Sequence, residues 1–98
     1  MSWTSPVPQP QAVIHHITCV TRAMIYGRLV KTHLSGPEGT WAYNEVIAWI
    51  DTGNHRFFTS DGWNTAEIEV HTSPDGIRYL QTVANGQITD NLDRLPNC

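Results

Sequence analysis

The sequence predicts a small α+β domain built mostly from short antiparallel strands, with one main helix and a short helical turn near its C-terminal end. One segment alternates apolar and polar residues with the period of a half-buried strand. Another places its apolar residues on one face of a helix. Turn residues (glycine, proline and asparagine) separate these segments. The length of 98 residues corresponds to a single domain.

The first eleven residues differ from the rest of the chain. Residues 1–11 contain three prolines at alternate positions, which remove backbone donors and favour an extended arm. We therefore divide the chain into an N-terminal arm, residues 1–11, and one domain, residues 12–98. The arm is either a loose tail or a segment that packs Trp3 and Val7 onto a neighbouring subunit.

An N-terminal hairpin is expected at the start of the domain. Residues 12–22 are rich in β-branched side chains, which favour a strand, and residues 28–34 give a second strand. Between them, Tyr26 and Gly27 supply a turn, because glycine tolerates a positive φ.

The main helix is expected over residues 41–53, after a loop at residues 35–39. Its apolar face is formed by residues spaced three or four apart: Val46, Ile47, Trp49 and Ile50, with Tyr43 one turn earlier. Gly53 and Asn54 end the helix, since either residue can take the left-handed conformation found after a helix C-terminus.

A C-terminal meander of three strands is expected next, at residues 56–59, 65–72 and 77–83. The turns that join them lie at residues 60–62 and 73–76, and Asn85-Gly86 closes the last strand.

The final segment predicts one helical turn. Thr89 or Asp90 caps it, Leu92 and Leu95 point inward, and Pro96 ends it.

Composition narrows the possible functions. The net charge of −3 disfavours a binder of duplex nucleic acid, which normally carries a basic stripe. No apolar run is long enough to cross a membrane. Charged residues make up only 15% of this small chain, so we expect another copy to cover part of its surface, as in a homo-oligomer. Cys19 and Cys98 are expected to be free thiols in a reducing compartment, which predicts a cytoplasmic protein.

No catalytic or metal-binding constellation stands out. His15 and His16 are adjacent and so point to opposite faces of a strand, and the other three histidines are scattered. Neither a nucleophile elbow nor a phosphate-binding glycine-rich loop is present. We therefore expect no enzymatic activity, no metal and no cofactor.

A binding surface is the remaining possibility. Phe57, Phe58 and Trp63 cluster around the turn at residues 60–62; Asn64 stands beside Trp63, and Arg56 precedes the two phenylalanines. Aromatic faces, an amide and a guanidinium together are suited to holding a purine and a phosphate. The alternative interpretation is that two of these aromatic side chains belong to the core. The cations nearest the N-terminal hairpin could form one basic edge: Arg22, Arg28 and Lys31.

The C-terminal half resembles a small uncharacterised domain of bacteria and phages. The resemblance rests on an aromatic-aromatic-Thr strand at residues 57–59, an Ala-Glu-Ile-Glu-Val strand at 66–70 and a Tyr-Leu-Gln-Thr strand at 79–82. The closing Asp-Asn-Leu-Asp-Arg-Leu-Pro of residues 90–96 is its most specific part. The resemblance covers about residues 13–96.

The same pattern is similar to the first type of phage Thoeris anti-defence proteins. This resemblance implies a protein that binds and sequesters a cyclic nucleotide immune signal, a cyclic ADP-ribose isomer or a cyclic oligonucleotide, without degrading it. It implies a dimer or larger symmetric assembly, with ligand pockets at subunit interfaces, in the cytoplasm of an infected bacterial host. Gln81 stands where this family usually has an arginine, which implies an altered ligand preference.

The expected ligand-binding set combines these observations: Phe57, Phe58, Trp63, Asn64, Arg78, Gln81, Arg22 and Arg28. The alternative is a protein-interaction module that inhibits or adapts a host protein. In that case Trp3, Trp41 and Trp63 would be its binding hot spots, since tryptophan is enriched in them.

Overall fold

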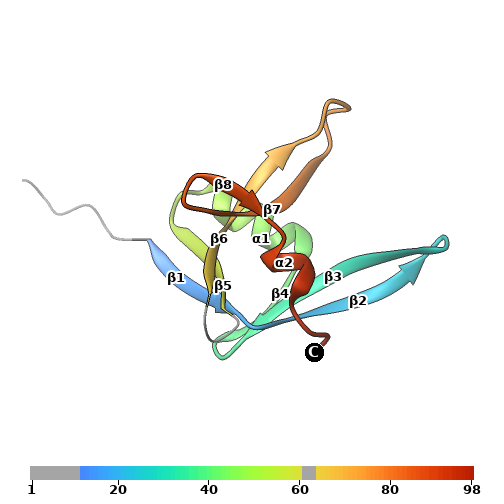
Figure 1. Ribbon diagram of the computed structural model, residues 1–98, viewed down its shortest axis with the longest axis horizontal. Coiled ribbons are helices and arrows are strands. Elements are labelled where there is room, and N and C mark those ends of the chain that lie inside the picture. Colours follow the sequence, from blue (N-terminus) through green and yellow to red (C-terminus); the bar gives the residue numbers. More distant parts are fainter. Residues whose placement is uncertain (1–11, 61–63) are drawn as a thin grey trace, which may run out of the picture.

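The structure is a computed structural model that describes residues 12–60 and 64–98. The predicted N-terminal arm, most of the predicted turn at residues 60–62, and Trp63 lie outside the described residues. Within those residues the chain forms eight strands and two helices, so the α+β prediction holds with strands dominating (Figure 1). No helix in the described part is long and apolar enough to cross a membrane.

The larger sheet has five strands in the order β1-β5-β6-β7-β8. It contains β1 (Val13–Ile17), β5 (His55–Ser60), β6 (Thr65–Thr72), β7 (Arg78–Ala84) and β8 (Gln87–Thr89). Strands β5 to β7 form the predicted antiparallel meander and β8 extends it by one more antiparallel strand, whereas β1 pairs with β5 in parallel. Strand β8 was not predicted, because its three residues are too few to show an alternating pattern.

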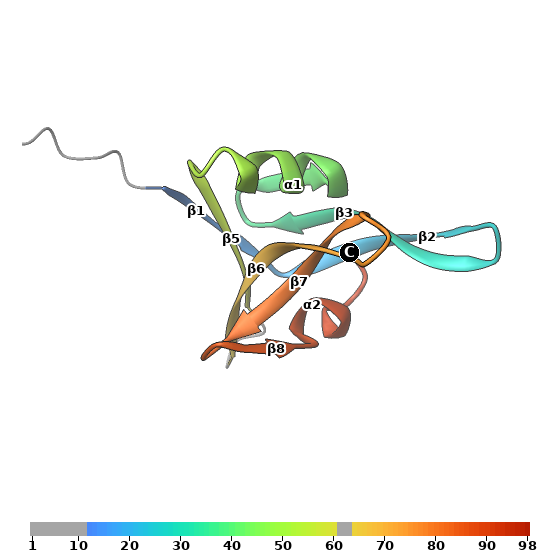
Figure 2. The same cartoon turned by 90° about the horizontal axis from the view of Figure 1, so that it is seen from above.

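The smaller sheet has three antiparallel strands in the order β2-β3-β4: β2 (Cys19–Ile25), β3 (Arg28–Gly36) and β4 (Gly39–Ala42). The β2–β3 hairpin extends well beyond the body of the molecule (Figure 2). Its turn is correctly predicted, since Tyr26 and Gly27 both have positive φ values, 49° and 76°, as a tight hairpin turn requires.

The predicted single strand over residues 12–22 is wrong. The chain leaves the larger sheet after Ile17 and enters the smaller sheet at Cys19, so the segment forms two strands. Thr18 lies at the junction, where its N–H donates to the carbonyl of Ser35 at 2.9 Å. Ile17 and Val20, three residues apart, are both fully buried, which a single strand of period two does not allow.

The two sheets touch where β3 ends. A Cβ atom added to Gly36 would lie 1.8 Å from the carbonyl oxygen of His16, so only glycine fits against the backbone of β1 there. The predicted loop at residues 35–39 is shorter in the structure. Strand β3 continues to Gly36, and a two-residue turn at residues 37–38 leads directly into β4.

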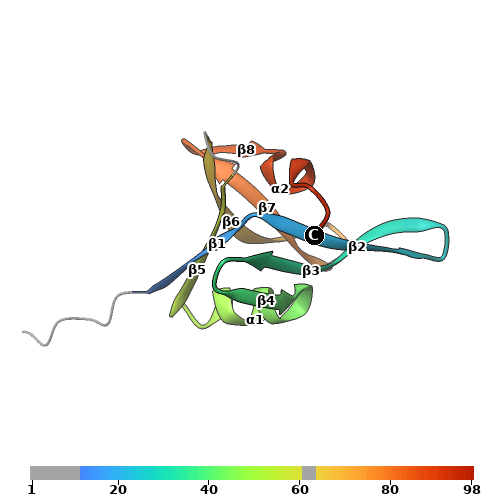
Figure 3. The ribbon, with the colours of Figure 1, turned by 90° about the horizontal axis from the view of Figure 1, so that it is seen from below.

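The two helices lie on opposite sides of the β2–β3 hairpin (Figures 2 and 3). Helix α1 (Tyr43–Asp51) begins two residues later than predicted, because Trp41 and Ala42 belong to β4. The Glu45 carboxylate accepts the Ala42 N–H at 2.9 Å, and Gly53 follows the helix with a φ of 77°. Helix α2 (Asn91–Arg94) is the predicted helical turn, although Asp90 caps it without a side-chain hydrogen bond.

One core joins both sheets and both helices. Its buried apolar side chains are Ile17, Val20, Leu34, Val46, Phe57, Ile68, Leu80, Leu92 and Leu95. Because every layer contributes to this single cluster, the two sheets form one domain.

The predicted free thiols are wrong, because Cys19 and Cys98 form a disulfide across 79 residues of sequence. After α2 the chain returns beside β2, where the Val20 N–H donates to the Pro96 carbonyl and the Cys98 N–H donates to the Val20 carbonyl, both at 3.0 Å. Sequence spacing could not reveal this pairing, since the return path is a tertiary feature. The cysteines therefore no longer support the predicted reducing compartment.

We expect Gly36→Ala to destabilise the fold by about 3 kcal/mol or more, because the added methyl group overlaps the His16 carbonyl and the β1 backbone must move. Gly86→Ala is the control: its φ is 76° and nothing lies within 4 Å, so we expect a loss of about 1–2 kcal/mol from backbone strain alone. Urea denaturation measures both, and equal losses would contradict the close approach.

Replacing both cysteines by serine should lower the free energy of unfolding by about 2–4 kcal/mol, because the 79-residue separation closes a long loop in the unfolded chain. Urea denaturation of the oxidised protein and of the Cys19→Ser, Cys98→Ser double variant measures the difference. Reducing the native protein should reproduce the loss. If a thiol reagent detects two free thiols in the denatured protein without prior reduction, the disulfide does not form.

Candidate anion-binding cleft

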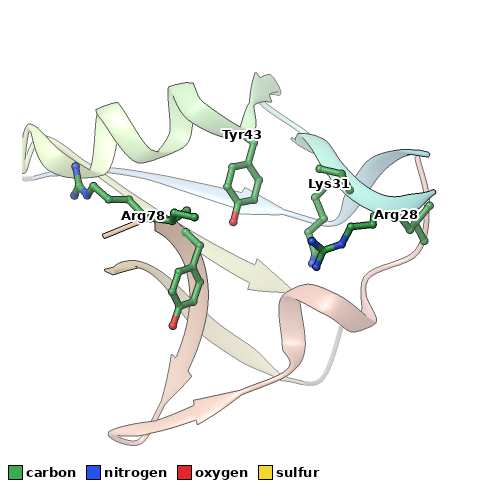
Figure 4. A pocket seen from close by; sticks show the side chains of 8 residues that line it. Arg28, Lys31, Tyr43 and Arg78 are labelled. Atoms are coloured by element: carbon green, nitrogen blue, oxygen red, sulfur yellow. The ribbon is translucent and has the colours of Figure 1, made fainter. Parts of the chain in front are cut away.

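A cleft of about 470 Å³ lies between the β2–β3 hairpin, the start of α1 and the β6–β7 hairpin. The two hairpins diverge from the body of the molecule, and side chains from both reach the cleft (Figures 1 and 4). The residues that line it are Arg28, Leu29, Val30, Lys31, Tyr43, Ile77, Arg78 and Tyr79. This is a mixture of cations, phenol rings and aliphatic groups.

Tyr43 anchors the middle of the cleft. It is the first residue of α1, and its hydroxyl oxygen accepts the Leu80 N–H at 2.7 Å, which ties the helix to β7. The Leu80 N–H can donate to the Tyr43 hydroxyl because β8 pairs only with residues 82–84 of β7 and so leaves this edge of β7 open at Leu80. Because the Tyr43 oxygen acts as the acceptor in this bond, its own proton remains available to a ligand.

Half of the six lysine and arginine residues of the chain line this cleft: Arg28, Lys31 and Arg78. Arg78 lies on one side of Tyr43, and Arg28 and Lys31 lie on the other (Figure 4). A net charge of −3 for the whole chain therefore conceals a local concentration of positive charge.

Arg78 is held by a carboxylate of α1. Its Nη1 and Nη2 atoms donate to the Oδ2 and Oδ1 atoms of Asp51, each at 2.5 Å, in a bidentate pair. The hydrogen bond from Arg78 lowers the pKa of Asp51 and raises that of Arg78. Both side chains stay about half exposed, so a ligand could reach the guanidinium without entering the core.

The two cations from β3 differ in their partners. The Lys31 ammonium pairs with the carboxylate of Asp93 in α2. The guanidinium of Arg28 makes no hydrogen bond or ion pair with any residue in 12–60 or 64–98. Arg28 is therefore the cation of the cleft whose charge no carboxylate of the described chain offsets.

The predicted phenylalanine pair is split across the sheet. Phe57 is completely buried in the core, whereas Phe58, the next residue of β5, faces the other side beneath Arg56. The Arg56 guanidinium also forms a bidentate ion pair with Glu67 at 2.8 Å. The alternative interpretation is therefore correct for Phe57, which is a core residue.

Two other predicted residues have structural roles. Arg22 donates to the carbonyls of Asp93 and Leu95 at 3.1 and 3.0 Å and to the Asn97 side chain at 2.6 Å, which fastens β2 to the segment after α2. Gln81 donates to the Thr89 carbonyl at 2.7 Å and so helps hold β8.

Of the predicted set, the structure brings only Arg28 and Arg78 into the cleft. Asn64 is exposed at the start of β6, and Trp63 lies outside the described residues. Trp41, one of the suggested hot spots, packs edge-on against Phe57 with ring centroids 5.3 Å apart.

No sequence pattern indicates that Tyr43 and Tyr79 line a cleft, and the sequence predicts Lys31 only on a basic edge. The helical spacing predicts Tyr43 on the apolar face of the helix, yet its hydroxyl has a polar partner in β7. Tyr79 follows Arg78 in β7, and no local pattern shows that this strand end meets the β2–β3 hairpin.

A second polar cluster lies away from the cleft. His15 is buried among Trp41, Trp49 and Phe57, and its Nδ1 lies 3.0 Å from a Glu38 carboxylate oxygen. Its Nε2 lies 3.0 Å from Nδ1 of His55. His15 and His16 face opposite sides of β1, as predicted, and His16 is the exposed one. Among the described residues, no three or more His, Cys, Asp or Glu side chains are placed to hold a metal ion.

Comparison with known protein families gives a match over most of the chain. A family model described as a protein of unknown function, DUF3892, matches residues 16–96. No curated protein and no solved structure matches the chain.

We expect Arg78→Gln to raise the pKa of the Asp51 carboxyl toward its ordinary value of about 3.9, because the bidentate partner is lost. In the native protein that pKa is lowered, so the pair stabilises the fold above the unfolded-state pKa of Asp51. This contribution is lost as the pH falls through the lower folded-state pKa. Carboxyl NMR titration measures the shift, and Arg94→Gln, which removes an arginine elsewhere, should leave Asp51 unchanged.

Proposed function

The chain belongs to the DUF3892 family of proteins of unknown function, and we propose that it binds a small anionic ligand in the Arg28–Tyr43–Arg78 cleft and sequesters it unchanged. The observation that carries this proposal is the gathering of three of the six cations, with two tyrosines, around one cleft. The fit to a phosphorylated ligand follows from the chemistry of these side chains, since guanidinium and ammonium groups are the usual partners of phosphate.

The lining suits a nucleotide in particular. The Tyr79 phenol ring offers a stacking surface, and the aliphatic side chains of Leu29, Val30 and Ile77 offer an apolar wall for a base or ribose. The cations then bind the phosphates, and the guanidinium of Arg28 has no partner among residues 12–60 and 64–98 that a ligand would have to displace. We propose a cyclic nucleotide immune signal as the ligand, a cyclic ADP-ribose isomer or a cyclic oligonucleotide, as the sequence resemblance implies. The site of action would be the cytoplasm of an infected bacterial host, as the resemblance implies, although the Cys19–Cys98 disulfide is unusual for that compartment.

Sequestration rather than catalysis fits the lining. The described residues that line the cleft include no carboxylate, imidazole or thiol, and the groups they offer are cations and phenols that suit the binding of an anion. A protein that only binds its ligand acts by mass action, so it requires tight binding and slow release.

A protein-interaction module is the second candidate function. One observation favours it: five apolar side chains at the outer end of the β2–β3 hairpin are exposed. A stoichiometric complex with a host protein, formed by a chain that binds none of the cyclic nucleotides, would establish this function in place of sequestration.

The experiment is a native-mass and thermal-shift screen of the purified chain against cyclic ADP-ribose isomers and cyclic di- and trinucleotides. We expect an added ligand mass, a raised melting temperature and intact ligand after denaturation. No binding of any of these ligands, or recovery of a converted product, would overturn the proposal.

For the ligand that binds, we expect Arg28→Gln to weaken affinity about tenfold or more, because a hydrogen bond between charged groups contributes about 1.5–3 kcal/mol. Arg94→Gln is the matched control: it removes the same charge from an arginine that is 77% exposed and does not line the cleft. Isothermal titration calorimetry of both variants measures the difference. Equal affinities would place the ligand outside this cleft.

A further inference from the structure

The β2–β3 hairpin ends in an exposed apolar tip. Met24 and Ile25, the last two residues of β2, are 67% and 44% exposed, and Tyr26 in the turn is fully exposed. The tip is the outermost part of the hairpin that projects from the body in Figure 2. Leu29 and Val30 on β3 line the cleft and are not counted in this tip. Three consecutive large apolar side chains in such a position mark an interaction surface.

The turn holds Tyr26 in an unfavourable backbone conformation. Tyr26 and Gly27 have φ values of 49° and 76°, which nearly equal the 53° and 76° of Asn85 and Gly86 in the β7–β8 turn. Asn-Gly is the usual pair for such a turn, because asparagine adopts a positive φ more readily than an aromatic residue does. Since Tyr26 is fully exposed, packing among the described residues does not account for an aromatic ring there. Its position therefore points to a role outside the fold.

The shape of the tip indicates what could cover it. Met24 and Ile25 are neighbours in β2 and so face opposite sides of the hairpin, whereas Tyr26 lies at its end. A flat protein surface or an added strand covers only one face or one edge of a hairpin. The interfacial layer of a lipid bilayer surrounds whatever enters it, and so covers all three side chains together. Tyrosine is favoured in that layer, because its ring is apolar and its hydroxyl stays hydrated.

Behind the tip the hairpin is basic. Residues 19–36 carry three cations and no acidic residue, and all nine acidic residues of the chain follow them in the sequence. Arg28 pairs with Ile25 across the hairpin, so it lies directly behind the tip. Its guanidinium has no partner among residues 12–60 and 64–98. A long arginine side chain at this place can reach a lipid phosphate while its apolar neighbours lie deeper.

We propose that this tip docks reversibly onto an anionic lipid surface. Met24, Ile25 and Tyr26 would enter the interfacial layer, and Arg28 would bind a lipid phosphate. An apolar tip and a basic region together supply the two weak signals that hold a peripheral protein on a membrane. The proposal goes beyond the proposed sequestration and does not rest on it, because docking requires no nucleotide. Since Arg28 also lines the cleft, the variants that test docking leave it in place.

Cosedimentation with lipid vesicles tests the proposal in the absence of nucleotide. The vesicles contain phosphatidylcholine alone or phosphatidylcholine mixed equally with phosphatidylglycerol. We expect the native chain to bind the mixed vesicles, to bind them more weakly as NaCl is added, and to bind phosphatidylcholine vesicles much less. A chain that binds neither kind of vesicle, or both equally, would overturn the proposal.

Tyr26→Asn should weaken binding to the mixed vesicles about tenfold or more, because the largest inserted side chain is lost. Its melting temperature should be unchanged or higher, because asparagine suits the turn. Tyr26→Trp should retain binding, since tryptophan also favours the interfacial layer. Ile88→Asn is the control: it removes a side chain that is 66% exposed on β8, outside the hairpin, and should bind as the native chain does. Native binding by Tyr26→Asn would contradict insertion of the tip.

A fluorophore that brightens in an apolar environment tests which part of the molecule enters the lipid. Attached to Met24→Cys, it should brighten on the mixed vesicles, and attached to Ile88→Cys it should not. Peptide mapping verifies that Cys19–Cys98 stays intact in both variants. An equal response at the two positions, or a hairpin that binds only a protein partner, would overturn the proposal.

Discussion

The architecture depends on the place where the backbones of β1 and β3 meet. The chain passes from the five-stranded sheet to the three-stranded sheet at Thr18, and this passage lies directly against Gly36. With no side chain at Gly36, the two sheets approach closely enough for Ile17, Val20 and Leu34 to share one core. From this contact the sheets diverge, and their two long hairpins leave the body separately (Figure 1). The cleft exists because the hairpins start together and end apart.

Electrostatics within the cleft are set by carboxylates at its margin. Asp51 compensates Arg78, and Asp93 compensates Lys31, so most of the local positive charge is already balanced. Arg28 keeps its charge uncompensated within the described chain. Such an arrangement disfavours nonspecific binding of polyanions while leaving one strong point of attachment, and the paired arginine and lysine can exchange their exposed partners for a phosphate.

Local patterns in the sequence predicted most of the elements but not how they meet. The alternation in residues 65–72, the Tyr26-Gly27 and Asn85-Gly86 turns and the Leu92/Leu95 helical turn are each encoded by neighbouring residues, and all four are present. The split of residues 12–22, the disulfide and the cleft depend on contacts between distant segments. Phe57 shows the limit most clearly, because adjacent aromatic residues in a strand face opposite sides, and only the tertiary structure tells which side is the core.

The bond between Cys19 and Cys98 also changes the covalent topology of the chain. Residues 19–98 form a closed ring that contains every element except β1, and the ring is fastened again by the hydrogen bonds of Val20 and Arg22. A single proteolytic cut anywhere in that ring separates no fragment, because both new ends stay attached through the sulfur bridge. A nicked molecule would therefore keep all its strands at high effective concentration, and damage to one loop would not disperse the fold.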